Sequence, residues 1–259
     1  MSTSQIHPTA VVAPGAQLGD GVEIGPYCVV GEGVTLGDRC RLQSHVVLAG
    51  PSVIGPDNVF YPFACVGQQT QDLKYAGEPT YLKIGAGNTF REFVTVHRAT
   101  APGGVTRVGS RGNFLSYSHI AHDCTVGDDV IFSNNGTLAG HVEVGDHAVI
   151  GGLTAVHQFC RIGRFAITGG CSKIVQDVPP FMMVDGNPAR VRHINQVGLE
   201  RAGVAKETIR RVKDAFRILY REDLNTAQAL ERMRGELGDG PEMTQLIEFV
   251  ASSKRGIVR

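Results

Sequence analysis

The sequence has no tryptophan, no excess of charge of either sign and no long apolar run. Its 259 residues contain 25 basic and 25 acidic side chains. The sequence therefore lacks the excess of basic residues that is typical of proteins that bind nucleic acid. No apolar run approaches the roughly 20 residues that a membrane helix needs. The N-terminal residues also lack the basic and apolar segments of a secretory signal. We therefore expect a cytoplasmic protein that binds no nucleic acid and has no membrane span.

What the sequence does contain is an apolar residue at every sixth position. In the first part of the chain this ladder comprises Ile6, Val12, Leu18, Ile24, Val30, Leu36, Leu42, Leu48, Ile54, Phe60 and Val66. A small or β-branched residue comes two positions earlier, and a glycine often follows. We interpret each unit as a short strand and a corner whose backbone is relieved by the glycine. Three units would form one turn of a prism, and stacked turns would pair as parallel strands about 4.8 Å apart. The sequence thus predicts a β-solenoid.

The ladder is interrupted twice. Residues 68–83 and residues 100–107 do not follow the pattern, which resumes at Ile84 and Val108 and closes near Asp177. Loops ejected from a rigid scaffold are where binding residues tend to lie. We therefore expect a β-helical domain over residues 1–190, with ejected loops near 68–83 and 100–107.

The period changes to that of a helix from about Asn195. Apolar spacing predicts a helix over Lys206–Tyr220, Asn225 can cap another that ends near Leu237, and a further helix is expected over Glu242–Ser252. The stretch between residues 179 and 192 is expected to be irregular. We predict a small C-terminal α-helical domain over residues 191–259, able to cover the open end of the solenoid.

Basic residues gather near the start of this helical domain. They are Arg201, Lys206, Arg210, Arg211, Lys213 and Arg217. They form either a solvated helix face or a docking surface for an acidic partner.

Four of the six cysteines occupy the same position of the six-residue repeat, two residues before a ladder residue. These are Cys28, Cys40, Cys124 and Cys160. We interpret them as small buried residues with free thiols in a reducing compartment, not as disulfide partners.

Three histidines are separated by about one turn of the predicted prism. His122, His141 and His157 should therefore line one edge, one strand spacing of about 5 Å apart, and His119 lies just before them. Such residues can satisfy local hydrogen bonds, bind zinc, or provide a general base.

The neighbours of His122 favour the general base. Asp123 offers a carboxylate that could orient the imidazole. Gly140 lies one turn further on, where its backbone N–H could reach a developing oxyanion. A base and an oxyanion donor on neighbouring turns suit acyl transfer, although the spacing does not identify the acyl group.

Several segments, together with the ladder, resemble one enzyme family. These segments are Gln71–Glu78, His119–Cys124, Leu138–Val142 and Ala155–Cys160. The ladder resembles that of the left-handed β-helix acyltransferases, and the segments resemble the UDP-N-acetylglucosamine O-acyltransferases of lipid A biosynthesis. The left-handed coil is implied by the resemblance alone, because parallel crossovers are usually right-handed.

The resemblance implies a homotrimer with active sites between subunits. It implies transfer of a 3-hydroxyacyl group from the phosphopantetheine of acyl carrier protein to the 3-hydroxyl of UDP-N-acetylglucosamine, the first step of lipid A biosynthesis. No metal and no further cofactor are implied. By resemblance, His122 is the general base, Asp123 is its partner and Gly140 is the oxyanion donor.

Further positions are matched to substrate binding by the same resemblance. They are Asp72, Lys74, His119, His141, His157, Gln158 and Arg201. Gly170 matches a position that limits the acyl chain and, as glycine, leaves room for a long one. The sequence departs from the family pattern at Pro188, where some members have histidine, and at Val197, where some have glutamate.

Three alternatives remain at this point. One is a metalloenzyme of the same fold, such as a γ-class carbonic anhydrase. Another is the related N-acyltransferase, which would carry a further domain ahead of the ladder, whereas here the ladder starts at Ile6. The third is a scaffold without enzymatic activity.

Overall fold

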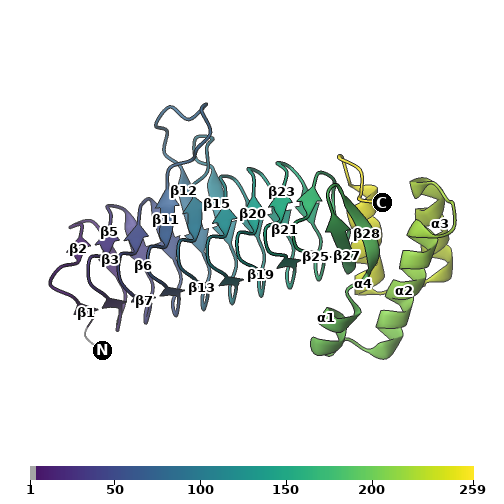
Figure 1. Ribbon diagram of the computed structural model, residues 1–259, viewed down its shortest axis with the longest axis horizontal. Coiled ribbons are helices and arrows are strands. Elements are labelled where there is room, and N and C mark those ends of the chain that lie inside the picture. The colour runs from purple at the N-terminus through teal and green to yellow at the C-terminus, as the bar shows by residue number, and fades with distance from the viewer. Residues whose placement is uncertain (1–3) are drawn as a thin grey trace.

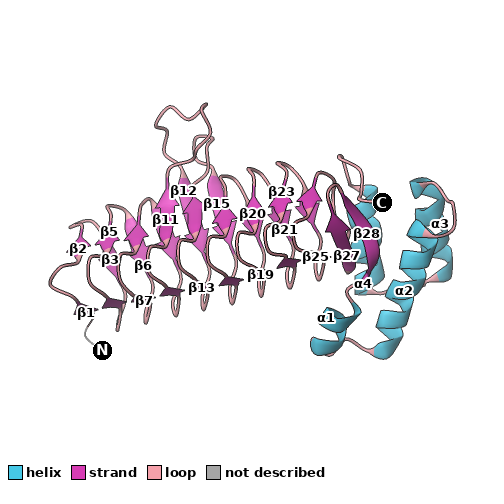
Figure 2. Ribbon diagram, in the orientation of Figure 1, coloured by secondary structure: helices cyan, strands magenta, loops and turns pink. Residues whose placement is uncertain are grey.

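The computed structural model describes residues 4–259 as an elongated parallel β-helix followed by a small helical domain (Figure 1). Three sheets run along the β-helix, and their strands are short (Figure 2). Sheet A contains β1 (Gln5–Ile6), β4 (Glu23–Ile24), β7 (Arg41–Leu42), β10 (Val59–Phe60), β13 (Thr89–Phe90), β16 (Asn113–Phe114), β19 (Ile131–Phe132), β22 (Val149–Ile150), β25 (Ile167–Thr168), β27 (Met182–Gly186) and β28 (Ala189–Ile194). Sheet B contains β2 (Val11–Val12), β5 (Val29–Val30), β8 (Val47–Leu48), β11 (Cys65–Gln68), β14 (Thr95–His97), β17 (His119–Ile120), β20 (Thr137–Leu138), β23 (Ala155–Val156) and β26 (Lys173–Ile174). Sheet C contains β3 (Gln17–Leu18), β6 (Val34–Leu36), β9 (Ser52–Ile54), β12 (Tyr81–Ile84), β15 (Val105–Val108), β18 (Thr125–Val126), β21 (Glu143–Val144) and β24 (Arg161–Ile162).

Strand pairing has the register that the ladder predicts. Ile6 pairs with Ile24, and each later strand pairs in parallel with the equivalent strand of the next turn. Ladder residues and the small residues two positions earlier both point inward, as buried Val30 and Cys28 illustrate. This alternation arises because residues separated by two positions share one face of a strand. The predicted β-solenoid is therefore confirmed.

Most glycines that follow a ladder residue have a different role from the one we expected, Gly67 with its φ of 85° being an exception. Gly25 does not have a positive φ, whereas Tyr27, in the same corner, has φ 58°. A Cβ on Gly25 would lie 1.7 Å from the backbone oxygen of Gln43 on the next turn. Glycine is needed there because successive turns approach closely, and other residues accept the left-handed conformation of the corner.

Each corner joins two sheets, so the prism has three edges, which we call A/B, B/C and C/A. Both ejected loops leave at the B/C edge, one between β11 and β12 and the other between β14 and β15. The first loop rises from the β-helix above β12 in Figure 1. Both loops are shorter than predicted, because residues 81–83 belong to β12 and residues 105–107 belong to β15. The period was hidden there by strands that extend beyond the usual two residues.

The C-terminal region differs from the prediction at its start. β27 and β28 form an antiparallel hairpin across the stretch that we expected to be irregular, and the predicted domain boundary at 190/191 falls inside β28. The helices follow as α1 (Gln196–Arg201), α2 (Lys206–Tyr220), α3 (Thr226–Glu236) and α4 (Pro241–Ala251). α2 has the predicted bounds, and Asn225 caps α3 with a capping box.

The open C-terminal end of the β-helix is covered by the hairpin and the chain terminus. Val184 of β27 and Val258 join the apolar core of the prism. The helices pack around a second core of their own, which includes Phe165 and Phe181. No helix within residues 4–259 combines the length and the apolar character needed to cross a bilayer. All six cysteines are free thiols, as predicted.

Candidate active site

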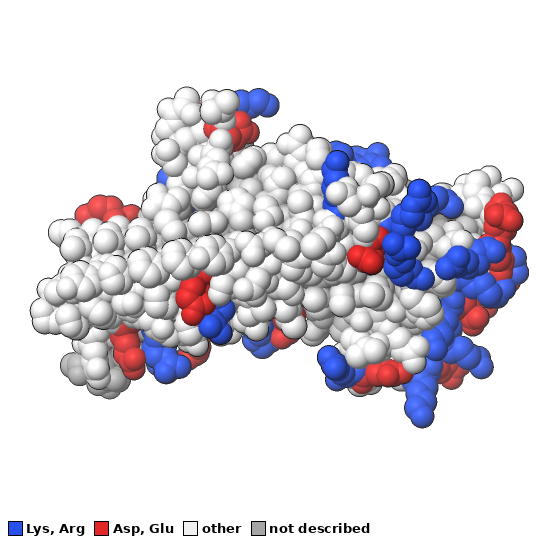
Figure 3. Space-filling view, viewed as in Figure 1, with Lys and Arg blue, Asp and Glu red and all other residues white. Residues whose placement is uncertain are grey.

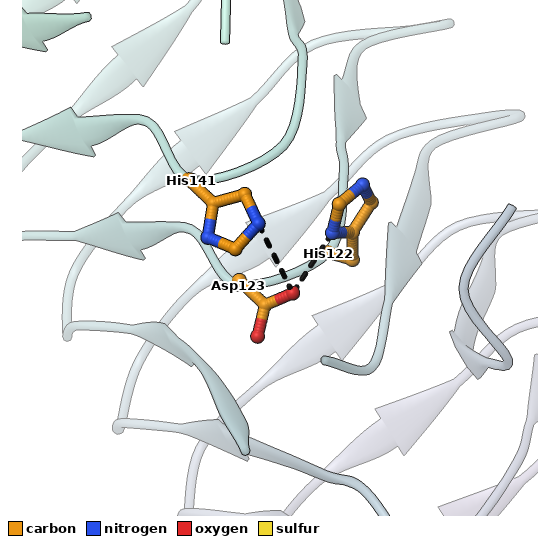
Figure 4. A group of neighbouring side chains, drawn as sticks. All are labelled: His122, Asp123 and His141. Carbon is orange, nitrogen blue, oxygen red and sulfur yellow. Dashed lines mark hydrogen bonds and ion pairs between the residues drawn. The ribbon is translucent and has the colours of Figure 1, made fainter. Parts of the chain in front are cut away.

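The B/C edge brings His122, Asp123 and His141 together. Figure 4 shows that both imidazoles point at the same carboxylate oxygen, Oδ2 of Asp123. His122 Nδ1 lies 2.8 Å from this oxygen, and His141 Nε2 lies 3.7 Å from it. The two rings meet edge to face, with centroids 5.2 Å apart. His122 and Asp123 are largely buried, and His141 is more exposed.

The carboxylate of Asp123 determines which nitrogen of His122 is free. An ionised carboxylate only accepts hydrogen bonds, so Nδ1 of His122 carries the proton and Nε2 has the lone pair. Gly140 lies against this free side, where a Cβ would approach Cε1 to 2.4 Å and Nε2 to 2.5 Å. The N–H of Gly140 donates to no acceptor within residues 4–259. A proton acceptor and an unpaired donor thus lie side by side.

Asp123 is held in place by the second ejected loop and by sheet C. The N–H of Thr100 in that loop donates to Oδ2 at 3.0 Å. The backbone N–H of Asp123 donates to the hydroxyl of Thr106 in β15 at 2.8 Å. Asp123 occupies the corner position with a φ of 60°. These contacts hold the carboxylate under the imidazole.

A cleft of about 420 Å³ opens beside His122. Its walls come from the first ejected loop and from β14, β17, β20 and β23 with their corners. It is lined by Gln71, Asp72, Lys74, His97, His119, Ala121, His122, Thr137, Leu138, Ala139 and Gln158. Four of the residues that the resemblance matched to substrate binding, Asp72, Lys74, His119 and Gln158, therefore share one cleft with the candidate base. Within the loop, Oδ1 of Asp72 accepts the N–H of Lys74 at 2.9 Å.

His119 forms a neutral wall of this cleft together with His97. Nδ1 of His119 is 2.7 Å from the hydroxyl of Thr95, and its ring meets that of His97 edge to face at 4.9 Å. Burial, with His97 and His122 nearby, lowers the pKa of His119 to about 4. Burial also lowers the pKa of His97. Both rings therefore stay uncharged near neutral pH.

Sequence reasoning did not identify His97. Its Nδ1 is buried without a hydrogen-bond partner within residues 4–259. His97 and His119 are 22 positions apart in sequence because the second ejected loop lies between them, although their strands β14 and β17 are adjacent. The available signal was a histidine directly after the ladder residue Val96, at the point where the ladder pauses.

The three histidines spaced along the edge do not form one stack. His141 stacks on Phe159, with centroids 4.6 Å apart and planes 13° apart. His157 instead contacts Arg255 near the C-terminus, with Nδ1 of His157 3.3 Å from Nη2 of Arg255. All three residues lie on the B/C edge, and the rings of His122 and His141 are 5.2 Å apart, as predicted. Their contacts differ because spacings of 19 and 16 residues place the rings at different positions of their corners.

Six further positions singled out by the resemblance do not line the His122 cleft in a single chain. Two of them, His141 and His157, lie on the same edge as the cleft, whereas the other four lie elsewhere. Gly170 is in the corner between β25 and β26, on the A/B edge. Arg201 ends α1, where Val197 is also exposed, and Pro188 lies in the turn between β27 and β28. In one chain, Gly170 and His122 therefore lie on different edges of the prism.

A second cleft of about 570 Å³ lies on the other side of Asp123. It is lined by Asp123, Thr125, His141, Glu143, Phe159, Arg161, Asp177, Ser252, Lys254 and Arg255. His141, matched to substrate binding, thus faces this cleft. The donor atoms of His122, Asp123 and His141 lie within 4.8 Å of one another, a spacing that would also suit a metal ion.

Lys and Arg side chains gather over the helical domain, whereas the same view of the β-helix shows few charges (Figure 3). Arg211 donates to the backbone oxygens of Leu237, Gly238 and Asp239, and Arg217 pairs with Glu222. These two arginines stabilise the domain itself, whereas the side chains of Arg201, Lys206, Arg210 and Lys213 make no hydrogen bond or ion pair within residues 4–259.

Comparisons with known proteins assign this architecture to a family. The sequence model of domain 2 of UDP-N-acetylglucosamine O-acyltransferases matches residues 177–258, and hexapeptide repeats of bacterial transferases match residues 2–32 and 15–50. The acyl-[acyl-carrier-protein]–UDP-N-acetylglucosamine O-acyltransferase of Thiobacillus denitrificans is 48% identical over 255 residues, with 98% of this chain and 99% of the relative covered. The chain belongs to the UDP-N-acetylglucosamine O-acyltransferase family.

Solved structures of this family have the same fold. The UDP-N-acetylglucosamine O-acyltransferase of Moraxella catarrhalis is 43% identical and superposes with a TM-score of 0.94, covering 98% of this chain and 99% of that one. The corresponding protein of Acinetobacter baumannii is 44% identical, with the same TM-score of 0.94 and the same coverage, 98% and 99%. The β-helix is therefore the left-handed parallel helix of the O-acyltransferase family, as the resemblance implied. Family membership also favours the O-acyltransferase over the carbonic anhydrase, the N-acyltransferase and the scaffold.

Proposed function

We propose that this protein transfers a 3-hydroxyacyl group from acyl carrier protein to the 3-hydroxyl of UDP-N-acetylglucosamine, the first step of lipid A biosynthesis. The observation that carries the proposal is the His122–Asp123 pair with Gly140 against its free nitrogen. The donor and the acceptor are those in the names of relatives nearly half identical to this chain.

In the proposed mechanism His122 is the general base. Its Nε2 takes the proton of the sugar hydroxyl while the hydroxyl oxygen attacks the thioester carbonyl carbon. The carbonyl π electrons move onto oxygen, which accepts the N–H of Gly140. When the tetrahedral intermediate collapses, the C–S bond breaks and the proton passes from His122 to the phosphopantetheine sulfur. Asp123 stabilises the imidazolium formed between these steps.

The cleft beside His122 suits the acceptor sugar. Asp72 and Lys74 line it from the ejected loop, and His119 and Gln158 line it from the β-helix. We assign these four residues and His141 to substrate binding. Because His119 stays neutral, we expect it to bind a hydroxyl or amide of the sugar and not a phosphate.

We further propose that the site is completed by a neighbouring subunit of a homotrimer. Gly170 and Arg201 do not line the His122 cleft in one chain, so a neighbour would supply them to the acyl chain and the nucleotide. The exposed rings of Tyr27, His45, Phe63, Phe93 and Tyr117 stack along the A/B edge, which also contains Gly170. Exposed apolar stripes of this kind mark interfaces, and a cyclic trimer sets one edge against a different edge of the next subunit.

Acyl carrier protein would dock on Arg201, Lys206, Arg210 and Lys213 of the helical domain. No metal enters the mechanism, because Asp123 Oδ2 already accepts from His122 and Thr100. Free thiols favour the cytoplasm.

The test is an assay of the purified protein with UDP-N-acetylglucosamine and 3-hydroxyacyl carrier proteins of graded chain length. We expect an ester at the sugar 3-position, a preference for long chains, and no loss of rate after chelation. His122→Ala should lower the rate at least about a hundredfold. The 3-amino analogue of the acceptor, assayed in parallel, should be a poorer substrate.

Two results would contradict the proposal. A stoichiometric metal whose removal abolishes activity would favour a metalloenzyme. Full activity of His122→Ala, with its melting temperature unchanged, would exclude His122 as the base.

A further inference from the structure

The last residues of the chain return to the final turn of the β-helix. Asp177, buried to 1% exposure, donates its N–H to the backbone oxygen of Gly256 at 2.9 Å and accepts the N–H of Val258 at 2.9 Å. Its Oδ2 accepts the hydroxyl of Ser253 at 2.8 Å. The strand-like pairing and the buried carboxylate hold residues 253–258 along sheet C. Arg255, between these anchors, is thereby placed at the B/C edge.

At this edge Arg255 meets His157. Nη2 of Arg255 lies 3.3 Å from Nδ1 of His157, although the two residues are 98 positions apart in sequence. A guanidinium has five N–H donors and no acceptor, and it does not lose its proton in proteins. This contact is therefore a hydrogen bond only when Nδ1 of His157 is unprotonated, which places the proton of the neutral ring on Nε2.

A second contact at the same nitrogen requires the opposite tautomer. Nδ1 of His157 is also 3.2 Å from the backbone oxygen of Gln158, which can only accept. The two contacts cannot both be hydrogen bonds to a neutral ring. A charged donor forms the stronger bond, so the guanidinium decides the tautomer. Burial raises the pKa of the nearby Cys160 thiol to about 11, so no thiolate competes for the guanidinium.

We propose that Arg255 is a positioning residue that sets the tautomer of His157. With Arg255 in place, His157 presents an Nε2–H donor at the B/C edge, suited to a phosphoryl or carbonyl oxygen of a substrate. Without Arg255, the ring turns to the Nδ1–H form bonded to Gln158, and Nε2 becomes an acceptor. The chain terminus thereby completes an edge whose other residues come from the β-helix.

The tautomer can be observed directly by 15N NMR of histidine-labelled protein at about pH 8.5, where an ordinary imidazole is neutral. His157→Gln identifies the signals of His157. We expect a protonated Nε2 in the wild type and in Arg255→Lys, and a shift towards protonated Nδ1 in Arg255→Ala. The matched control is Arg259→Ala, because Arg259 is also near the terminus but donates to Thr226 in the helical domain. The same His157 pattern in wild type and Arg255→Ala overturns the proposal.

Activity provides a second readout, which rests on the proposed function, whereas the NMR readout does not. Arg255→Ala should lower kcat/KM about tenfold, as loss of an orienting partner typically does. Arg255→Lys should recover most of this loss, and Arg259→Ala should have no effect. In a His157→Gln background, Arg255→Ala should not lower kcat/KM any further, because Arg255 acts through the imidazole. Additive losses in this double-mutant cycle would contradict the proposal, and an inactive wild type would contradict the proposed function alone.

Discussion

His141 on the B/C edge and His147 on the C/A edge have almost the same local structure. Both occupy the left-handed corner position, with φ 61° and 58°. His141 lies 3.7 Å from Asp123 and stacks on Phe159 at 4.6 Å. His147 lies 3.8 Å from Asp129 and stacks on Phe165 at 4.5 Å. The repeat thus builds a histidine, a carboxylate and an aromatic ring twice.

The two edges differ in the further side chain that contacts the carboxylate, besides the histidine that both edges have. On the C/A edge Arg111 donates two hydrogen bonds of 2.8 Å to Asp129, so the charges there neutralise one another. On the B/C edge the partner of Asp123 is His122, whose Nε2 stays free beside the unpaired N–H of Gly140. Both ejected loops also leave at this edge. The candidate site is therefore where the repeat leaves polar atoms unpaired, not where it places histidines.

Among the variants that distinguish the two edges, Gly140→Ala should cause the largest loss of rate. The new Cβ would lie within 2.5 Å of two atoms of the His122 ring and force it from its place. Displacement of a base by about 1 Å can lower the rate about a hundredfold. We expect a decrease of that order in kcat, measured at constant concentrations of acceptor and donor. Gly152→Ala is the control, because its Cβ would meet nothing nearer than 3.4 Å. If both variants retained full rate, Gly140 would not belong to the site.

Exchanging the two similar histidines for alanine should give a smaller but selective effect. His141→Ala should lower kcat/KM about tenfold, because His141 lies next to the Asp123 carboxylate that orients the base. His147→Ala removes an equivalent ring from an edge that contributes no residue to either cleft beside Asp123 and should leave the rate unchanged. Steady-state kinetics of both variants measure the difference, and equal losses would mean that stability alone accounts for them.

The smallest expected effect is on stability and concerns His119. Its pKa is lowered to about 4 by burial, whereas the unfolded chain titrates near 6.5. Between these pH values the unfolded state binds a proton that the folded state does not. The free energy of unfolding should therefore fall by about 1 kcal/mol for each pH unit below 6.5 and level off below about pH 4.

Urea unfolding at constant protein concentration measures this slope. His119→Gln keeps a hydrogen-bonding group near Thr95 but cannot titrate, so its slope should be smaller. A slope unaffected by His119→Gln would show that this histidine is not neutral in the folded protein.

The sequence alone determined the β-helix, its register and most of the helical domain. The reason is that a period of six specifies, residue by residue, which side chains face inward, and α2 follows its own apolar spacing in the same way. The pair of His122 and Asp123 and the neighbouring turn with Gly140 were also predictable, because they follow from one turn of the repeat. The family resemblance supplied the substrates, which no spacing indicates.

Only the tertiary structure decided the features in which the period is broken or in which distant segments meet. The hairpin of β27 and β28 has no hexapeptide period, and His97 is hidden by an ejected loop. The three histidines lie on one edge as predicted, but their different positions within the corners give His141 and His157 separate partners, Phe159 and Arg255. The contact of Arg255 with His157 depends on the chain terminus folding back onto Asp177. Such contacts depend on three-dimensional closure, because residues 98 positions apart share no local pattern.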